Sequence, residues 1–352
     1  MPITSQDVAR LAGVSQPSVS RALRDVPGVS AATRKRVRDA AKALGYVPFH
    51  SGWTLATRTT GRVAIVADEL SNPFYPALVA PLHDALGDAG FRTLLVTDSG
   101  SKPAELEPLL DGSLDGVLLA SSRTGSTVPL ALARRGVPFV MVNRELDGVQ
   151  ADRCVAANRD GARRVAAHLT GLGHVRVGAV FGPRSASTAR QRESGFRAGL
   201  LARRIPLPAT RVQRCEFDFD AGREAFLRIL DQENAPTAVF CANDVLALAA
   251  LDAAHAAGVS VPGDVSVVGF DDIPMAAWHV FSLTTVHIDL RRLAVSAAAL
   301  LLKRMDAPDA RPQRVEIPAS LSVRLTTAPV ASAADDHPAW RRSTRPRQAS
   351  GV

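Results

Sequence analysis

The feature that most constrains the fold of this chain is a repeated alternation of short apolar runs with amphipathic helical patterns after residue 61. Runs rich in β-branched residues and bounded by turn residues are typical of strands buried in a parallel sheet. The alternation occurs as two successive sets, which predict two doubly wound α/β lobes. Ligands of such sheets bind at the carboxyl ends of the strands, so the cleft between the lobes is the expected binding site. The predicted strands are VAIVA (63–67), TLLVT (93–97), GVLLA (116–120), FVMV (139–142), VRVGAVF (175–181), AVFC (238–241) and VSVVGF (265–270).

The first 47 residues predict a separate, all-helical domain. Its three short amphipathic patterns are separated by turns. Gly13 stands where the first pattern ends, because glycine adopts the left-handed backbone of a helix C-terminus without strain. Ser15 is placed to cap the second helix, and Pro17 falls in its first turn, where no amide donor is lost. Two helices joined by a short turn containing glycine form a helix-turn-helix, whose second helix enters the major groove of DNA.

The distribution of charge supports a nucleic-acid-binding head. Of the net charge of +8, residues 1–60 carry +6, from nine Arg or Lys against three Asp, and residues 331–352 carry +2. The 270 residues between these segments are neutral. A neutral body with a basic head is the electrostatic footprint of a DNA-binding module attached to an ordinary domain.

Composition and motifs argue against several other classes of protein. No stretch of 18 apolar residues predicts a membrane span, and the charged first thirty residues do not read as a secretory signal, so a soluble cytoplasmic protein is expected. The three cysteines, Cys154, Cys215 and Cys241, have the spacing of neither a disulfide framework nor a zinc site. HExxH, GxSxG and P-loop motifs are absent. We therefore expect no enzyme activity, no metal and no cofactor.

Specific segments of the chain resemble the LacI/GalR family of transcriptional regulators. In the head these are ITSQDVARLAGVSQPSVSRAL (3–23), VSAATRKRV (29–37) and LGYVP (44–48). In the body they are SNPFY (71–75), HLTGLGHVRVG (168–178), ARQRESGF (189–196), CANDVLALAAL (241–251), VPGDVSVVGFDD (261–272) and LTTVHID (283–289). The resemblance implies an all-α helix-turn-helix DNA-binding head and an α/β body of two doubly wound lobes like those of periplasmic binding proteins.

Domain boundaries follow from this resemblance. The implied segments are a helix-turn-helix domain (1–47), a hinge linker (48–60), an effector-binding and dimerisation domain (61–328) and a disordered basic tail (329–352). By similarity to periplasmic sugar-binding proteins, whose chains cross between lobes, one lobe comprises about 61–157 with 287–307 and the other about 158–286 with 312–328. The tail carries no leucine heptad of the kind that joins some relatives into tetramers, so a homodimer is expected.

The resemblance also implies which residues contact DNA. Gln16, Pro17 and Arg21 occupy the base-reading positions; Arg21 can donate two hydrogen bonds to guanine, whereas Pro17 offers only apolar contact. The implied phosphate contacts, which position the head without reading bases, are Ser5, Ser15, Ser20 and Arg34.

In the hinge linker, Leu55 stands at the position of the family's leucine that wedges into the minor groove. The chain departs from the family pattern at Phe49, Gly52 and Trp53. Gly52 lowers helix propensity by about 1 kcal/mol relative to alanine. Trp53 is either an additional apolar contact or an exposed linker residue.

Effector contacts carried over from the family fall on Phe74, Tyr75, Asn143, Arg190, Phe219 and Asp244, with Trp278 as a further candidate. These types suit a polyol, because Asp accepts and Arg donates hydrogen bonds to hydroxyls while aromatic faces cover the C–H side of a sugar ring. From the residues alone, Asp244 can also be a helix cap, Arg190 a solvated helix residue and Phe219 an ordinary core residue. The adjacent pair Asp271–Asp272 is expected in a structural loop.

The function expected from these observations is that of a transcriptional regulator. A homodimer would bind a palindromic double-stranded DNA operator and act as a repressor that a small sugar or sugar derivative releases. The alternatives are the same fold sensing a purine or another non-sugar ligand, or acting as an activator. A sugar transport protein is disfavoured by the basic head. A Rossmann enzyme is disfavoured because GLGHVRVG (171–178) lacks the third glycine of the dinucleotide fingerprint.

Overall fold

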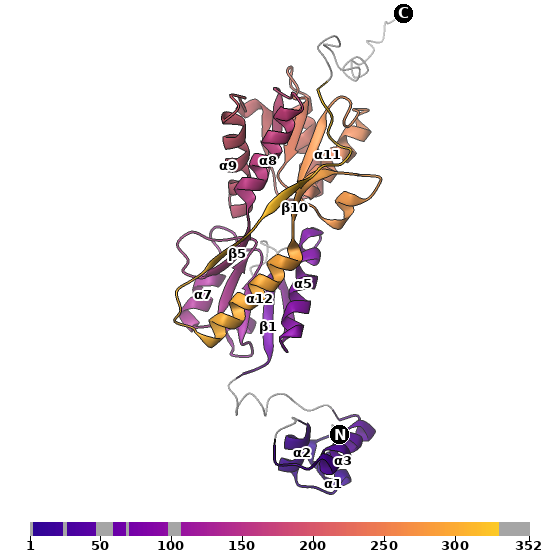
Figure 1. Ribbon diagram of the computed structural model, residues 1–352, viewed down its shortest axis with the longest axis vertical. Helices are drawn as coiled ribbons and strands as arrows, with labels where there is room; N and C mark the ends of the chain where they lie inside the picture. Colours follow the sequence, from indigo (N-terminus) through magenta and orange to yellow (C-terminus); the bar gives the residue numbers. More distant parts are fainter. Residues whose placement is uncertain (1–2, 24–26, 47–58, 68–69, 98–106, 331–352) are drawn as a thin grey trace, which may run out of the picture. The chain divides into compact units, whose positions relative to one another are not determined.

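The computed structural model describes residues 3–23, 27–46, 59–67, 70–97 and 107–330. The chain divides into two compact units, which we call the head (residues 1–60) and the body (residues 61–352). Figure 1 shows the helices of the head and the two lobes of the body.

The head consists of helices α1 (Ser5–Ala12), α2 (Gln16–Leu23) and α3 (Ala31–Leu44). At the start of α1, the backbone N–H and the hydroxyl of Thr4 donate to the Asp7 carboxylate at 2.9 and 2.7 Å. The helix ends at Gly13, whose φ of 63° is the left-handed conformation that the sequence predicted there. The fully buried side chains at the centre of this unit come from all three helices and are Val8, Val19, Ala22 and Val37.

The first lobe of the body is a six-stranded sheet of order β11-β5-β4-β3-β1-β2, with every pairing parallel. Helices cover both faces of this sheet, α5 and α12 on one face and α6 and α7 on the other. Successive side chains of β1 point to opposite faces, and both sets are therefore buried. Its elements are β1 (Arg62–Ala67), α5 (Phe74–Asp88), β2 (Arg92–Thr97), α6 (Glu107–Leu110), β3 (Gly116–Leu119), α7 (Val128–Arg135), β4 (Phe139–Val142), β5 (Asp152–Ala156), α12 (Leu290–Asp306) and β11 (Arg314–Ile317).

The second lobe is a six-stranded sheet of order β12-β10-β9-β8-β6-β7, parallel except for the antiparallel pair of β10 and β12. Helices α8 and α9 pack on one side, and α10 and α11 on the other (Figure 1). Its elements are α8 (Asn158–Gly171), β6 (Val177–Phe181), α9 (Ser187–Leu201), η1 (Ala209–Arg211), β7 (Val212–Arg214), α10 (Phe219–Leu230), β8 (Ala238–Cys241), α11 (Asp244–Ala256), β9 (Ser266–Asp271), η2 (Pro274–Ala277), β10 (Thr284–Ile288) and β12 (Ala319–Ser322).

The chain passes between the lobes after β5, after β10 and after β11. The last crossing corrects a predicted boundary, because residues 312–328 were all assigned to the second lobe. Arg314–Ile317 instead pair with β5 in the first sheet, and only β12 belongs to the second. Pro318 stands between the two strands, and its lack of an N–H donor suits a position where strand pairing is interrupted.

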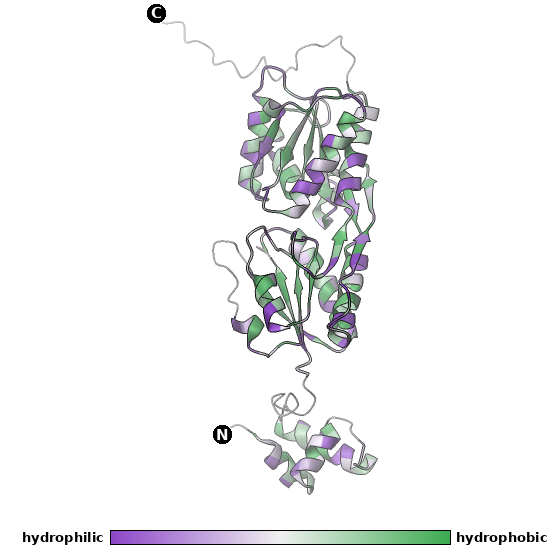
Figure 2. Cartoon of the chain, turned by 90° about the vertical axis from the view of Figure 1, so that its left-hand side faces the viewer, coloured by the Kyte–Doolittle hydropathy of each residue, from purple (hydrophilic) through white to green (hydrophobic). Residues whose placement is uncertain are grey.

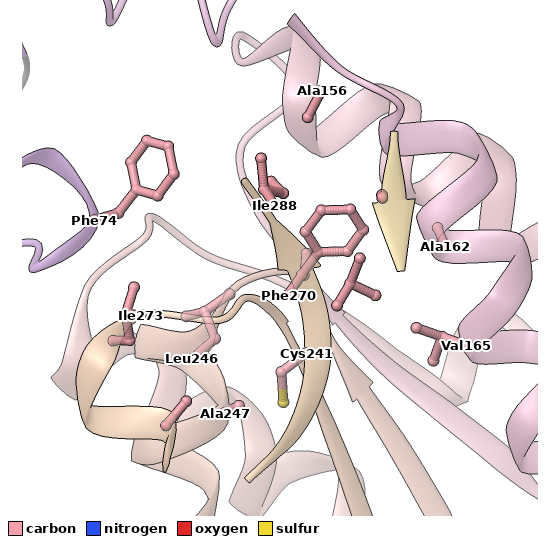
Figure 3. Close-up of a cluster of buried hydrophobic side chains, with 14 of the residues drawn as sticks. Phe74, Ala156, Ala162, Val165, Cys241, Leu246, Ala247, Phe270, Ile273 and Ile288 are labelled. Atoms are coloured by element: carbon pink, nitrogen blue, oxygen red, sulfur yellow. The ribbon is translucent and has the colours of Figure 1, made fainter. Parts of the chain in front are cut away.

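Apolar side chains line the strands and the inner helix faces, while polar residues cover the outer helix faces (Figure 2). One cluster of buried side chains includes residues of both lobes; Figure 3 shows Phe74 of α5 together with second-lobe residues such as Phe270 and Ile273. None of the described helices is long and apolar enough to span a membrane.

Strand β2 is more exposed to solvent than expected, since the sequence TLLVT was predicted to form a buried strand. It lies at the edge of its sheet, paired only with β1 among the described strands, and Leu94 and Leu95 are 44% and 41% exposed. An edge strand can leave apolar side chains accessible to solvent, which the sequence pattern of a buried strand does not reveal.

Candidate functional site

The outer face of α2 carries the predicted base-reading residues. Gln16, Pro17 and Arg21 are exposed, whereas Val19 and Ala22 are buried against the other helices of the head. This division follows the helical period, because the buried residues occupy one side of the helix and leave the opposite side to solvent. The head therefore presents a guanidinium and an amide on one accessible helix face.

The predicted phosphate contacts have mixed environments. Ser15 is exposed, while Ser5, Ser20 and Arg34 are half-buried. Gln16 Nε2 donates to Ser5 Oγ at 3.0 Å, so these two predicted DNA contacts, one on α2 and one on α1, are bonded to each other. The predicted minor-groove residue Leu55 lies outside the described residues, as do the tail residues from 331 onward.

A partly open cavity lies between the lobes of the body. It is formed where strands end, as expected for α/β sheets: Asn143 follows β4, Asn243 follows β8 and Asp271 ends β9. The lining residues are Asn72, Phe74, Tyr75, Asn143, Arg144, Thr188, Arg192, Phe217, Asn243 and Asp271.

Aromatic rings from both lobes surround an arginine in this cavity. Phe74 and Tyr75, in the first turn of α5, form an edge-to-face pair with ring centroids 5.5 Å apart. The Arg144 guanidinium lies 5.8 Å from the Tyr75 ring and 5.8 Å from the ring of Phe217, which belongs to the second lobe. In this cation–π geometry the guanidinium covers one face of each of these two rings.

Asn143 supplies a buried polar atom that has no partner within the described part of the chain. Its side chain is 5% exposed, and no described residue donates a hydrogen bond to its Oδ1. Its φ of 64° is also in the left-handed region, where asparagine is tolerated better than most residues. Buried acceptors without a donor are uncommon in folded proteins, so this atom marks a place for a ligand hydroxyl or amine.

The second lobe contributes a buried ion pair. Arg192 donates from Nη2 to Asp271 Oδ1 at 2.7 Å, from Nη1 to the Ala242 carbonyl at 2.7 Å and from Nε to Asn158 Oδ1 at 2.9 Å. Its guanidinium lies 3.8 Å from the centre of the Phe270 ring. The guanidinium is therefore held rigidly at the cavity wall.

Burial raises the pKa of Asp271 to about 6, although the charge and hydrogen bond of Arg192 act in the opposite direction. Its φ of 118° is a further sign of strain at this position. The sequence had placed Asp271 in a structural loop. The structure places it in the cavity wall instead, because β9 ends there.

Asp244 was expected to line the cleft, and the structure corrects this. It is fully buried, receives hydrogen bonds from Thr285 Oγ1 and from the Ile273 backbone N–H, and has a pKa raised well above its ordinary value by burial and by the charge of Asp271. The neighbouring Asn243 lines the cavity and also caps α11 by accepting from the Leu246 N–H. The role of helix cap, which the sequence allowed for Asp244, is thus played by Asn243.

Arg190 also lies outside the cavity lining. Thr188 and Arg192 are four residues apart on α9 and share the face that lines the cavity, whereas Arg190 is about 200° around the helix from each. Arg190 instead bridges the lobes at their rim, with Nη1 donating to Thr124 Oγ1 at 3.2 Å and Nη2 lying 3.5 Å from Asp147 Oδ2. The sequence did not single out Thr188, so the helical period alone could not have selected Arg192 over Arg190.

Two of the predicted aromatic contacts also lie outside the cavity lining. Phe219 begins α10 and is 42% exposed, while Phe217, two residues earlier, lines the cavity. Trp278 is 55% exposed and stacks on Phe281, outside the cavity. Of the seven predicted ligand contacts, the structure brings Phe74, Tyr75 and Asn143 to the cavity wall.

Together these side chains can bind a small polyhydroxylated molecule. Three Asn side chains, one Thr hydroxyl, two guanidiniums and one carboxylate supply donors and acceptors, and three aromatic rings supply apolar surface. Among the described residues, no group of three His, Cys, Asp or Glu side chains is arranged to hold a metal ion.

Comparison with protein-family models gives two matches. Residues 4–48 match the family described as "Bacterial regulatory proteins, lacI family", and residues 166–327 match "Periplasmic binding protein-like domain". These matches confirm the predicted fold of a helix-turn-helix head and a two-lobed α/β body.

Individual relatives are similar along nearly the whole chain. The HTH-type transcriptional regulator CelR of Thermobifida fusca is 36% identical over 331 residues, covering 91% of this chain and 97% of the relative. The solved CelR–cellobiose complex has a TM-score of 0.71 and 34% identity, covering 92% of this chain and 100% of that chain. The lac repressor dimer bound to operator and the anti-inducer ONPF has a TM-score of 0.82 and 26% identity, covering 93% and 100%.

Proposed function

The chain belongs to the lacI family of bacterial regulatory proteins, and from that premise we propose that it is a repressor that a small sugar or sugar derivative releases from its operator. Its relatives are HTH-type transcriptional regulators, and the exposed face of α2 is the surface of the head that would read bases. The sensing part of the proposal depends on the cavity between the lobes.

The observation that carries the sugar assignment is the buried, unpartnered Oδ1 of Asn143 in a cavity that also holds Asp271 and Arg192. A carboxylate, a guanidinium and an amide within one small cavity match the vicinal hydroxyls of a sugar ring, and the rings of Phe74 and Phe217 match its C–H face. The relative solved with cellobiose supports a sugar as the class of ligand.

The DNA-binding unit in this proposal is a homodimer on a palindromic site. Two heads related by a twofold axis read two half-sites, which requires the bodies to associate. The exposed Leu94 and Leu95 on the edge strand β2 are an apolar surface that a second copy would bury. A solved structure to which this chain is similar, the lac repressor bound to operator, is a dimer.

Effector and operator would be linked thermodynamically. If each ligand favours a different placement of the two lobes, each lowers the affinity for the other by the same factor. The sugar would bind between lobes, so its binding energy acts directly on their relative placement. We propose that this coupling is negative, so that sugar binding releases the operator.

A ligand screen by thermal unfolding tests the sensing role. Aldopentoses, aldohexoses, disaccharides and hexose phosphates form one panel, and purine bases and nucleosides form the second. A ligand that binds only the folded body raises its melting temperature. A shift with a sugar supports the proposal, whereas a shift with purines alone would favour the non-sugar alternative.

A paired substitution locates the site of the sugar found in this screen. Thr188→Val removes a cavity hydroxyl with little change of shape and should weaken sugar binding by about 1 kcal/mol, the net value of a typical hydrogen bond. Thr210→Val makes the same change at an exposed position of the second lobe and should leave the affinity unchanged. Equal calorimetric affinities for both variants and the original protein would place the sugar elsewhere.

Release of DNA requires its own measurement. An operator selected from random duplexes by the full-length protein would be titrated by fluorescence anisotropy, with and without the sugar. Weaker operator binding in the presence of the sugar supports an inducer, whereas tighter binding would make the sugar a co-repressor and reverse the proposed sign.

A further inference from the structure

A chain of four polar side chains, which we call the relay, connects the first lobe to the cavity wall: Glu145, Gln191, Asn158 and Arg192. Glu145 follows β4 in the first lobe, and its Oε1 accepts from Gln191 Nε2 of α9 in the second lobe at 2.6 Å. Gln191 Oε1 accepts from Asn158 Nδ2 at 3.0 Å. Asn158 Oδ1 accepts from Arg192 Nε at 2.9 Å, and Arg192 then reaches Asp271 at the cavity wall.

The direction of every hydrogen bond in the relay is determined by its neighbours. Asn158 Nδ2 also donates to the Ala156 carbonyl at 3.2 Å, and its Oδ1 faces the guanidinium of Arg192, which can only donate. Gln191 must therefore turn its oxygen toward Asn158 and its nitrogen toward Glu145, whose carboxylate can only accept. A buried network with all its members satisfied in one arrangement is rigid and specific.

Glu145 is anchored on the side of the first lobe. Its Oε2 lies 3.3 Å from Arg314 Nε on β11 and 3.6 Å from Arg153 Nη1 on β5. Its backbone N–H crosses to the second lobe and donates to Ser187 Oγ at 3.0 Å. Movement of the lobes apart would break both this bond and the bond between Glu145 and Gln191.

We propose that Glu145 and Gln191 are positioning residues, which fix Asn158, and through it the Nε–H of the Arg192 guanidinium, only while the two lobes are in contact. Asp271 and the Ala242 carbonyl hold the other two nitrogens from within the second lobe. Separation of the lobes removes the acceptor of Gln191 Nε2, and this half-buried amide is then free to turn. Asn158 Nδ2 then keeps only its bond to the Ala156 carbonyl, so the bond between Asn158 Oδ1 and Arg192 Nε is held less firmly. The inference rests on the proposed function in taking the cavity as a ligand site, and it explains how ligand binding at Arg192 would depend on lobe contact.

A carboxylate–amide exchange tests the relay. In Glu145→Gln, the single amide oxygen at position 145 cannot accept hydrogen bonds from Gln191 and from both arginines. In Gln191→Glu, the carboxylates at positions 145 and 191 face each other without a donor between them. The double variant Glu145→Gln/Gln191→Glu restores the pattern. The carboxylate introduced at position 191 accepts from Asn158 and from the amide introduced at position 145, whose oxygen accepts from Arg314. Glu224→Gln, in the exposed pair with Arg228 on α10, is the matched control.

Two readouts on the full-length protein need neither a sugar nor an operator. Hydrogen exchange at the backbone amide of residue 145 reports the lobe contact, because that N–H donates across it to Ser187. The Nε–H resonance of Arg192 reports the guanidinium, because this proton is bonded to Asn158. The resonance is assigned by its loss in Arg192→Lys. Exchange rates are corrected for the intrinsic effect of the substituted residue.

We expect both protons to exchange about tenfold or more faster in each single variant, and to return to within about threefold of the original rates in the double variant and the control. Rapid exchange in the double variant as well, or unchanged exchange in the single variants, would overturn the relay. Because no sugar or DNA enters the measurement, its failure would leave the proposed function untouched. Failure of the ligand screen would in turn leave the relay untouched.

Discussion

Removal of Arg192 should destabilise the body by an amount that depends on pH. Arg192 and Asp271 are both buried, and the pair is joined at 2.7 Å. Arg192→Leu keeps an apolar side chain against the Phe270 ring but leaves the Asp271 carboxylate without its guanidinium. Breaking a buried pair by removing one partner costs about 3–5 kcal/mol, because the remaining charge is uncompensated. This is the cost expected near pH 8.

The pH dependence follows from the raised pKa of Asp271, about 6 in the folded protein against 3.8 as the ordinary value. A carboxyl with a raised folded-state pKa binds more protons in the folded state, so the stability it contributes at low pH is lost as pH rises through that pKa. In the original protein this loss is about 1.4 kcal/mol per pH unit between about pH 4 and 6. Loss of Arg192 raises the pKa of Asp271 further, so the decline continues above pH 6 in the variant. The destabilisation should therefore be smaller at pH 5 than at pH 8.

Urea unfolding at fixed protein concentration, followed by tryptophan fluorescence at pH 5, 6, 7 and 8, measures the free energies of unfolding. Asp244, whose pKa is also raised, interacts by charge with both Arg192 and Asp271, so the difference between the two proteins reports the two buried carboxyls together. The double variant Arg192→Leu/Asp271→Leu should recover most of the loss, since a well-packed apolar pair can replace a buried ion pair. Equal destabilisation at pH 5 and pH 8, or a double variant no more stable than the single one, would refute this electrostatic reasoning.

Three further predictions concern DNA binding and assembly. Arg21→Ala should cost about 1–3 kcal/mol and relax preference at one base pair in each half-site, while Arg34→Ala should weaken all sequences alike; identical binding profiles would contradict the division into reading and positioning. Leu55→Ala should lower affinity for the best operator more than for random DNA in titrations of both, and an unchanged ratio would exclude a minor-groove wedge. Leu94→Asp/Leu95→Asp should convert the dimer to a monomer in analytical ultracentrifugation at micromolar protein, and a persistent dimer would show that β2 is not in the interface.

Local signals in the sequence were sufficient for the head and for most of the strands. Gly13 ends a helix in the left-handed conformation because few other residues adopt it, and Pro17 sits in the first turn of α2 as its missing N–H allows. The apolar runs at 139–142 and 238–241 are the strands β4 and β8 with the same bounds. These features depend on a few neighbouring residues, so they can be recognised without knowledge of the rest of the chain.

Local signals did not predict which strands lie at the edges of the sheets. Strand β2 has the composition of a buried strand but lies at an edge, and β11 joins the first sheet although the chain around it was assigned to the second lobe. Which strands neighbour each other is decided by pairing between segments far apart in sequence. Arg314–Ile317, for example, pair with Arg153–Ala156.

For the candidate site, the alternation of strands and helices in the sequence determined the cleft between two α/β lobes as the place for a ligand. Resemblance of the sequence to the LacI/GalR family selected Phe74, Tyr75 and Asn143, which do line the cavity. Tertiary structure alone decided between Arg190 and Arg192. Residues two apart on a helix differ by about 200° in direction, and only packing against the sheet sets the rotation of that helix. The burial of Asp244 beneath the cavity and the position of Asp271 in its wall likewise depend on where α11 and β9 meet, a contact between segments that local sequence patterns do not encode.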